Sequence, residues 1–90
     1  MNNYNIKIYK NGNKCYYLNG NLHREDGPAV EYIDGQKEWY KNGKRHRQDG
    51  PAIEYAAGNK AWYLNDKFYG YDIEFTNESW QRFIKTLIFS

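Results

Sequence analysis

The sequence predicts a mostly β protein: a single antiparallel meander sheet of about six to seven short strands, followed by one C-terminal amphipathic α-helix. Two observations lead to this prediction. One segment recurs at a fixed spacing with hairpin turns inside it, and the last segment changes from strand spacing to helix spacing. The 90 residues fit one domain over positions 1–90, with hairpin repeats over 6–72 and the helix over 76–89.

The repeat can be seen directly in the chain. The segment from His23 to Tyr32 recurs from His46 to Tyr55, an offset of 23 residues. The same offset relates four further sets, namely Tyr16, Trp39 and Trp62; Lys14, Lys37 and Lys60; Gly12, Gly35 and Gly58; and Tyr9, Tyr32 and Tyr55. We therefore expect about three stacked hairpin units, with atypical units at both ends that cap the array.

Turn residues divide each unit into short strands. Asn-Gly at 11–12, 19–20 and 42–43 and Asp-Gly at 34–35 favour two-residue type I′ turns, in which both central residues have positive φ. The two Asp-Gly-Pro-Ala segments are expected to form longer corners between units, since Pro lacks a backbone N–H. Counting outward from these turns places Trp39 opposite His46 and Val30, and Glu38 opposite Arg47.

Strand alternation then predicts two different faces. The first is aromatic and combines Val30, Tyr32, Trp39 and His46 with their counterparts Ile53, Tyr55, Trp62 and Tyr69. The second is a mixed row of Glu31, Glu38, Tyr40, Arg45 and Arg47, bordered by Ile6, Ile8, Tyr17 and Leu22 at one end and by Tyr63 and Phe68 at the other.

The last segment has helical spacing after a Thr76 or Asn77 N-cap. Its apolar side chains recur at i, i+3, i+4, i+7 and i+8, at Trp80, Phe83, Ile84, Leu87 and Ile88. We expect this stripe to pack on the sheet, and binding of a partner is the alternative.

The composition argues against several classes of protein. The 13 basic and 11 acidic residues are interspersed, so no basic patch indicates nucleic-acid binding. The lone Cys15 excludes an internal disulfide, and no apolar run approaches the ~20 residues of a membrane-spanning helix. We expect a soluble protein of the cytoplasm, or of the host cytoplasm if the chain is viral, with no membrane insertion and no cofactor.

The conspicuous polar residues are interpreted as structural. His23 with Asp26 and His46 with Asp49 could suggest acid–base or metal chemistry. However, each pair recurs in every complete unit, whereas a catalytic site is assembled once, so we expect no catalytic and no metal-binding residues. Trp39 and Trp62 complete this structural set. Cys15, which the same counting places opposite Arg24, is expected to be a surface or core thiol; a small enzyme or metal protein using the His-Arg-x-Asp motifs is the alternative.

A known family has a similar unit. The stretch from Trp39 to Lys60, with the pattern WYxNGxxHRxDGPAxEYxxGxK, resembles the MORN-repeat variants of phage, giant-virus and bacterial proteins. The resemblance extends from about Ile6 to Asp72, although ordinary MORN units are richer in Gly and lack the His-Arg-x-Asp-Gly-Pro-Ala core. It implies stacked hairpins in one elongated, twisted sheet, a non-catalytic character, and a role in protein or membrane association.

These observations favour a non-enzymatic protein-interaction module. If the chain is a viral factor, its partner is expected to be a host protein such as a defence complex, which it would inhibit in the manner of an anti-CRISPR protein. A homodimer through a sheet edge or the helix is a further expectation, and nucleic-acid binding by arginines beside tyrosines is the alternative. The candidate interaction surface comprises Tyr17, Arg24, Glu31, Glu38, Tyr40, Lys44, Arg45, Arg47, Tyr63 and Phe68.

Overall fold

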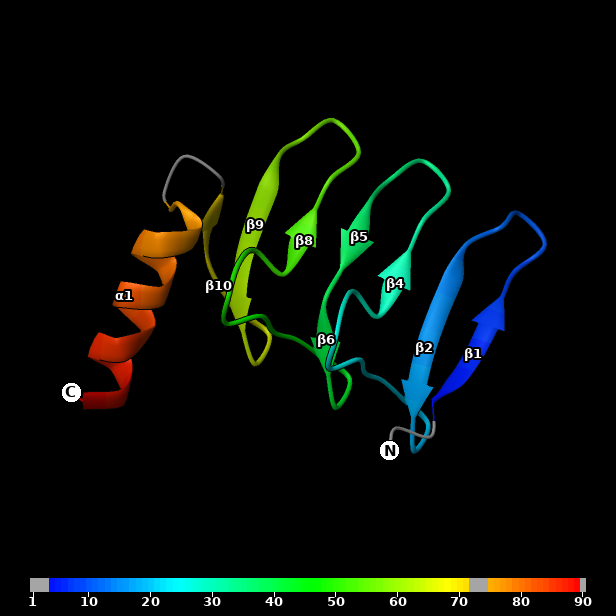
Figure 1. The fold of residues 1–90 in the computed structure, drawn as a ribbon, viewed down its shortest axis with the longest axis horizontal. Helices are drawn as coiled ribbons and strands as arrows, with labels where there is room; N and C mark the ends of the chain where they lie inside the picture. Colours follow the sequence, from blue (N-terminus) through cyan, green and yellow to red (C-terminus); the bar gives the residue numbers. More distant parts are fainter. Residues whose placement is uncertain (1–3, 72–74, 90) are drawn as a thin grey trace.

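The computed structural model describes residues 4–71 and 75–89, with the last two of these described by their backbone alone. The chain forms an antiparallel meander sheet with one helix at its C-terminal end, and the molecule measures 42 × 31 × 19 Å (Figure 1). This arrangement confirms the predicted fold class. The predicted end of the repeat region at Asp72 lies outside the described residues.

The strands follow one another across the sheet in the order β1-β2-β4-β5-β8-β9-β10, with β3 paired to β2 and a separate ladder between β6 and β7. Their bounds are β1 (Asn5–Ile8), β2 (Lys14–Leu18), β3 (Asn21–Leu22), β4 (Val30–Glu31), β5 (Lys37–Glu38), β6 (Tyr40–Lys41), β7 (Lys44–Arg45), β8 (Ile53–Glu54), β9 (Lys60–Leu64) and β10 (Lys67–Tyr71), and the helix is α1 (Asn77–Phe89).

The tight turns that join neighbouring strands at one end of the hairpins are two-residue turns with positive φ at both positions. Asn19-Gly20 and Asn42-Gly43 adopt this conformation, as predicted, with φ of 53° and 83° in the first pair and 52° and 80° in the second. The third unit uses Asn65-Asp66 in the same way, with φ of 49° and 70°. The recurrence of this turn fixes the pairing of β2 with β3, β6 with β7 and β9 with β10.

The turns at the opposite end of the strands are longer than predicted. The backbone N–H of Tyr32 donates to the carbonyl of Gln36 (2.9 Å), which leaves a three-residue loop that ends in Gly35 at φ 99°. The loop that ends in Gly12 is built in the same way. Val30 therefore lies opposite Glu38, and its predicted pairing with Trp39 is wrong. A shift of one residue moves a side chain to the other face of a sheet.

The Asp-Gly-Pro-Ala segments form the predicted corners, and an arginine holds each of them. Arg47 donates from Nε to Asp49 (2.9 Å) and from Nη1 to the Pro51 carbonyl (3.1 Å) and to Glu54 (2.9 Å). Arg24 makes the equivalent bonds to Asp26, Pro28 and Glu31. Because the chain leaves the ladder after His46, Glu38 pairs with Ile53, and the predicted Glu38–Arg47 pair is wrong.

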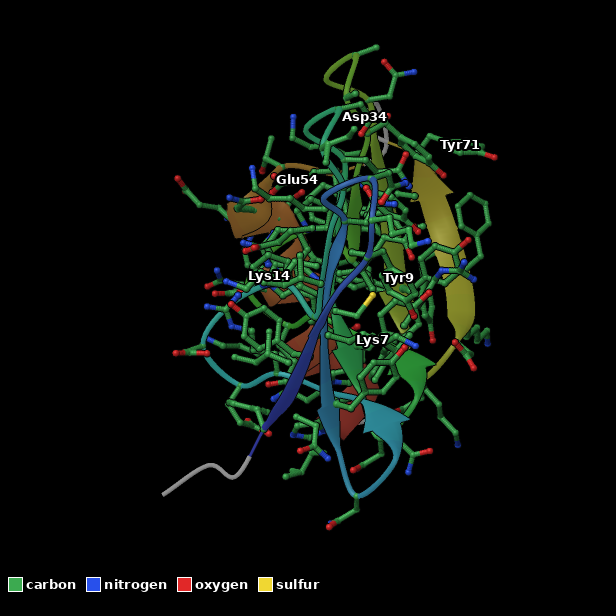
Figure 2. All side chains as sticks on the ribbon, turned by 90° about the vertical axis from the view of Figure 1, so that its right-hand side faces the viewer. Lys7, Tyr9, Lys14, Asp34, Glu54 and Tyr71 are labelled. Atoms are coloured by element: carbon green, nitrogen blue, oxygen red, sulfur yellow. The ribbon has the colours of Figure 1, made fainter. Side chains whose placement is uncertain are left out.

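The sheet has two chemically different faces (Figure 2). Cys15, Val30, Glu38, Ile53 and Ala61 lie opposite one another on one face. Alternating lysines and glutamates lie across the other face, in the order Lys14, Glu31, Lys37, Glu54 and Lys60. The predicted grouping of Val30 and Tyr32 with Trp39 and His46 is therefore wrong, although the backbone N–H of His46 does donate to the Trp39 carbonyl (3.1 Å). The predicted place of Ile6 and Ile8 beside Tyr17 is also wrong, because Ile8 pairs with Lys14 on the charged face.

The helix begins after Thr76, whose hydroxyl accepts a hydrogen bond from the Ser79 N–H (3.0 Å) while the Ser79 hydroxyl accepts one from the Thr76 N–H (2.8 Å). This reciprocal N-cap settles the choice between Thr76 and Asn77. The first part of the stripe on α1 packs against the sheet, as predicted, because Trp80 and Ile84 are buried with Trp62 and Phe83 packs against them, whereas Leu87 is 40% exposed. The side chain of Ile88, the last predicted member of the stripe, lies outside the described residues. No helix in the described chain is long and apolar enough to cross a membrane.

Candidate interaction surfaces

Aromatic side chains gather on the face that α1 does not cover. We call this the tyrosine face and define it by Tyr9, Tyr17, Tyr32, Tyr40, Tyr55, Tyr63, Phe68 and Tyr71. Tyr9 and Tyr71 lie on the side of the sheet away from Lys14 and Glu54 (Figure 2). Tyr9 is 40% exposed, Phe68 44% and Tyr71 57%. Rings at this level of exposure offer a partner a large contact area at low entropic cost.

A groove runs over the N-terminal half of the tyrosine face. Its cavity is about 640 Å³, and its walls include Tyr9, Tyr17, Leu22, Tyr32 and Tyr40, with Glu38 also reaching it. The tyrosine hydroxyls are partly linked to one another: Tyr9 Oη and Tyr17 Oη are 3.4 Å apart, and this contact raises the pKa of Tyr17 to about 12. The groove therefore presents neutral hydroxyl groups over an apolar wall.

Glu38 is the buried carboxylate of this face. It is 5% exposed and accepts hydrogen bonds from the Tyr40 hydroxyl (2.7 Å) and from the side-chain amide of Gln36 (2.8 Å). Burial and the Glu38 carboxylate raise the pKa of both Tyr32 and Tyr40. Hydrogen bonding satisfies the Glu38 charge and fixes the rings around it.

Arg45 lies between two rings of the same face. Its guanidinium carbon is 5.7 Å from the centre of the Tyr40 ring and 5.5 Å from that of Tyr63. Its Nε is 4.0 Å from Glu38 Oε1, too far for a hydrogen bond, and is a buried nitrogen with no hydrogen-bond partner within the described residues. The tyrosine face thus carries a guanidinium that is positioned by two rings and whose Nε–H has no acceptor among the described residues.

Cys15 also lies on this face but is buried. It pairs with Lys7 and Val30, so its predicted position opposite Arg24 is wrong. Burial raises the pKa of the Cys15 thiol, and a thiol with a raised pKa is a poor nucleophile at neutral pH.

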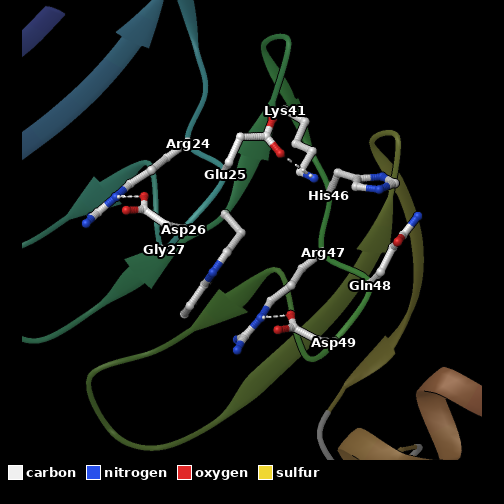
Figure 3. A pocket seen from close by; sticks show the side chains of 10 residues that line it. Arg24, Glu25, Asp26, Gly27, Lys41, His46, Arg47, Gln48 and Asp49 are labelled. Atoms are coloured by element: carbon white, nitrogen blue, oxygen red, sulfur yellow. Dashed lines mark hydrogen bonds and ion pairs between the residues drawn. The ribbon is translucent and has the colours of Figure 1, made fainter. Parts of the chain in front are cut away.

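The opposite face carries stacks of arginine on aromatic rings. The guanidinium of Arg24 lies over Tyr16, 3.9 Å from the ring centre, and that of Arg47 lies over Trp39 at 3.8 Å. A cavity of about 520 Å³ lies between these two corners. Its lining includes Trp39, Lys41 and His46, as the close view shows for the latter two (Figure 3).

The two histidines serve the turns of the next hairpin. The Asn42 N–H donates to His23 Nδ1 (2.9 Å), and the Asn65 N–H donates to His46 Nδ1 (3.1 Å). In His23, Nε2 therefore carries the proton and donates to Glu25 (2.6 Å). Within the described chain, no three His, Cys, Asp or Glu residues are grouped so that they could hold a metal ion.

The predicted interaction residues divide between the two faces. The tyrosine face contains Tyr17, Glu38, Tyr40, Arg45, Tyr63 and Phe68, whereas Arg24, Glu31 and Arg47 hold the corners of the opposite face and Lys44 follows an exposed turn. Sequence reasoning missed Tyr9 and Tyr32 as groove residues. Their offset of 23 residues was visible, but the wrong loop length assigned Tyr32 to the other face.

Comparison of the chain with protein-family models, with curated proteins and with solved structures gives no match. Membership of the MORN-repeat variant family remains a prediction from the repeat pattern.

Proposed function

We propose that this protein is a non-enzymatic interaction module that binds a partner protein through its tyrosine face. The observation that carries this proposal is the uncovered aromatic face: its groove reaches the hydrogen-bonded carboxylate of Glu38, and Arg45 lies between Tyr40 and Tyr63 on the same face. Tyr and Arg are enriched among the residues that dominate binding energy at protein interfaces. The conspicuous histidines support a non-enzymatic role, because both are engaged by backbone groups of the next turn.

The partner is proposed to be a host protein. The resemblance of the repeat to those carried by phages and giant viruses supports a viral factor that acts in the host cytoplasm, where a defence complex would be its target. The edge strand β1 exposes Ile6 (51%) and Ile8 (67%). This edge is where we place the homodimer expected from the sequence.

The test is affinity capture from host lysate with matched variants. We expect Tyr9→Ser combined with Phe68→Ser to lose the captured partner, because both rings are exposed on the tyrosine face and their loss leaves the core intact. The control combines Ile33→Ser, at an exposed loop position (68%), with Lys37→Ser on the charged face; neither residue lines the groove or lies in β1. Equal recovery of the same proteins by both double variants would contradict the proposal.

Nucleic-acid binding is the second candidate, and the position of Arg45 between Tyr40 and Tyr63 favours it. Arginine beside stacked rings is a common way to hold single-stranded bases. Binding to random oligonucleotides at low salt, with a steep loss of affinity as salt is raised, would support this candidate. No binding at low salt would remove it.

A further inference from the structure

We propose that the cavity beside Trp39 is a socket for an aromatic side chain, preferentially tryptophan, presented by a partner protein. We call this cavity the Trp39 socket; its walls include Arg24, Trp39, Lys41 and His46. Trp39 follows Glu38, which lies on the tyrosine face, so the Trp39 socket opens on the opposite face and is independent of the proposed function.

The third unit shows what such a socket holds. Trp80 of α1 lies 5.3 Å from Trp62 and 5.6 Å from Tyr69 between ring centres, and Leu64 packs against the cluster that Trp80 forms with Trp62 and Ile84. The Trp80 indole N–H donates to the Arg47 carbonyl (2.9 Å). With the repeat offset of 23 residues, these neighbours are the counterparts of residues that line the Trp39 socket, with Trp62, Tyr69, Leu64 and Arg47 corresponding to Trp39, His46, Lys41 and Arg24.

The first unit is filled in a related way. Tyr4, from the segment before β1, meets the Tyr16 ring edge to face at 5.8 Å, and its hydroxyl accepts a hydrogen bond from the Glu25 N–H (2.8 Å). The outer members of the set Tyr16, Trp39 and Trp62 are thus each covered by an aromatic ring from outside the repeats. Within the described residues, Trp39 makes no contact with another aromatic ring. The guanidinium of Arg47 lies over the Trp39 ring, and the cavity beside that ring stays open.

The lining explains why the middle socket is open in the free chain. Lys41 and His46 stand where the third unit has Leu64 and Tyr69, so the middle socket is lined by groups that tolerate water. Lys41 is held by Glu25 (3.2 Å) at the rim and does not compete for the ring site. The Arg24 carbonyl is the counterpart of the acceptor that the Trp80 indole uses, which favours tryptophan over phenylalanine.

The test is an NMR titration of the isotope-labelled full chain with N-acetyl-L-tryptophanamide. We expect saturable shifts of the Trp39 indole N–H and of the Lys41 and His46 amides, with a Kd on the order of 1–10 mM for a single ring. N-acetyl-L-leucinamide at the same concentrations should leave these signals in place. Shifts concentrated on Tyr17 and Tyr40, or no shift up to the solubility limit of the probe, would overturn the proposal.

A pair of lysine variants provides the matched control. Lys41→Leu introduces the leucine that, as Leu64, packs against the cluster of Trp62 and Trp80, and we expect it to bind the probe roughly three- to tenfold more tightly. Lys44→Leu, in the same hairpin but outside the socket, should bind with unchanged affinity. Equal affinities for the two variants would contradict the socket. Because capture through the tyrosine face uses the other side of the sheet, either proposal can fail without the other.

Discussion

At the scale of single residues, the repeat histidines act as acceptors for backbone groups. His46 receives the Asn65 N–H at Nδ1, so the proton of the neutral ring is on Nε2. Burial and the nearby Lys41 lower the pKa of His46 below its ordinary value of 6.5. A second proton would remove the acceptor on which the third tight turn depends.

This arrangement predicts a loss of stability in mild acid. The unfolded chain takes up a proton on His46 near pH 6.5, whereas the folded chain does so only at a lower pH. The contribution of neutral His46 to the free energy of unfolding is therefore fully present above pH 6.5, and it declines as the pH falls towards the folded pKa. Denaturant unfolding at pH 7.5 and 5.5 should show this decline, and His46→Gln should reduce it. Identical pH dependence in the two proteins would contradict this role of His46.

A second residue-scale prediction concerns Arg47. Its planar guanidinium stacks on Trp39 and bonds Asp49, Glu54 and the Pro51 carbonyl at once, a geometry that an ammonium group does not reproduce. We expect Arg47→Lys to lower the free energy of unfolding by about 1–2 kcal/mol. Arg82→Lys, on the exposed side of α1, should change it by less than about 0.5 kcal/mol. Similar losses would show that charge alone matters at the corner.

At the scale of elements, loop length decided which sequence predictions held. The existence of the hairpins, corners and helix followed from turn residues and spacing, and Tyr17, Glu38, Tyr40, Arg45, Tyr63 and Phe68 were placed together correctly. The same Asn-Gly pair, however, closes a two-residue turn at 42–43 and ends a three-residue loop at 11–12. The repeat contained the signal that separates them: the counterpart of Asn11 and Asp34 is Ala57, a residue that avoids positive φ.

The path of the chain inside the corners could not be predicted in the same way. Glu31 and Arg47 were assigned to the second face by alternation, and the same counting placed Arg24 opposite Cys15, but alternation applies only while the chain stays in the ladder. The departure after His23 and His46 is fixed by bonds from each arginine to a backbone carbonyl four residues later, which spacing alone does not reveal.

The three-residue loop makes an element-scale prediction. Gly35 has φ 99° and open space where a Cβ would be, so Gly35→Ala is opposed by backbone strain and not by a clash. We expect it to cost about 1–2 kcal/mol of unfolding free energy. Asp34→Ala reproduces the natural residue of the third loop and loses only the side-chain bond to the Gln36 N–H, at a cost of about 0.5 kcal/mol. Denaturant unfolding measures both losses, and equal losses of unfolding free energy in the two variants would contradict the three-residue loop.

At the scale of the whole molecule, the sheet is a row of units whose ends need covering. The fully buried side chains of Trp62 and Trp80 lie at the C-terminal end of this row, where α1 covers the last unit. In a stacked array, each unit is stabilised mainly by contacts with its neighbours. Damage at one end is therefore expected to weaken that end first.

Trp80→Ala tests this view. Removing a buried Trp should lower the free energy of unfolding by about 3–5 kcal/mol, while Gln81→Ala, at an exposed position next to it, should have little effect. Hydrogen exchange on the folded variant should show amides of β9 and β10 losing protection before those of β1 and β2, because the lost contacts with Trp62 and Tyr69 lie in the last unit. An equal loss of protection across all strands would instead show that the units unfold as one cooperative body, despite their one-dimensional arrangement.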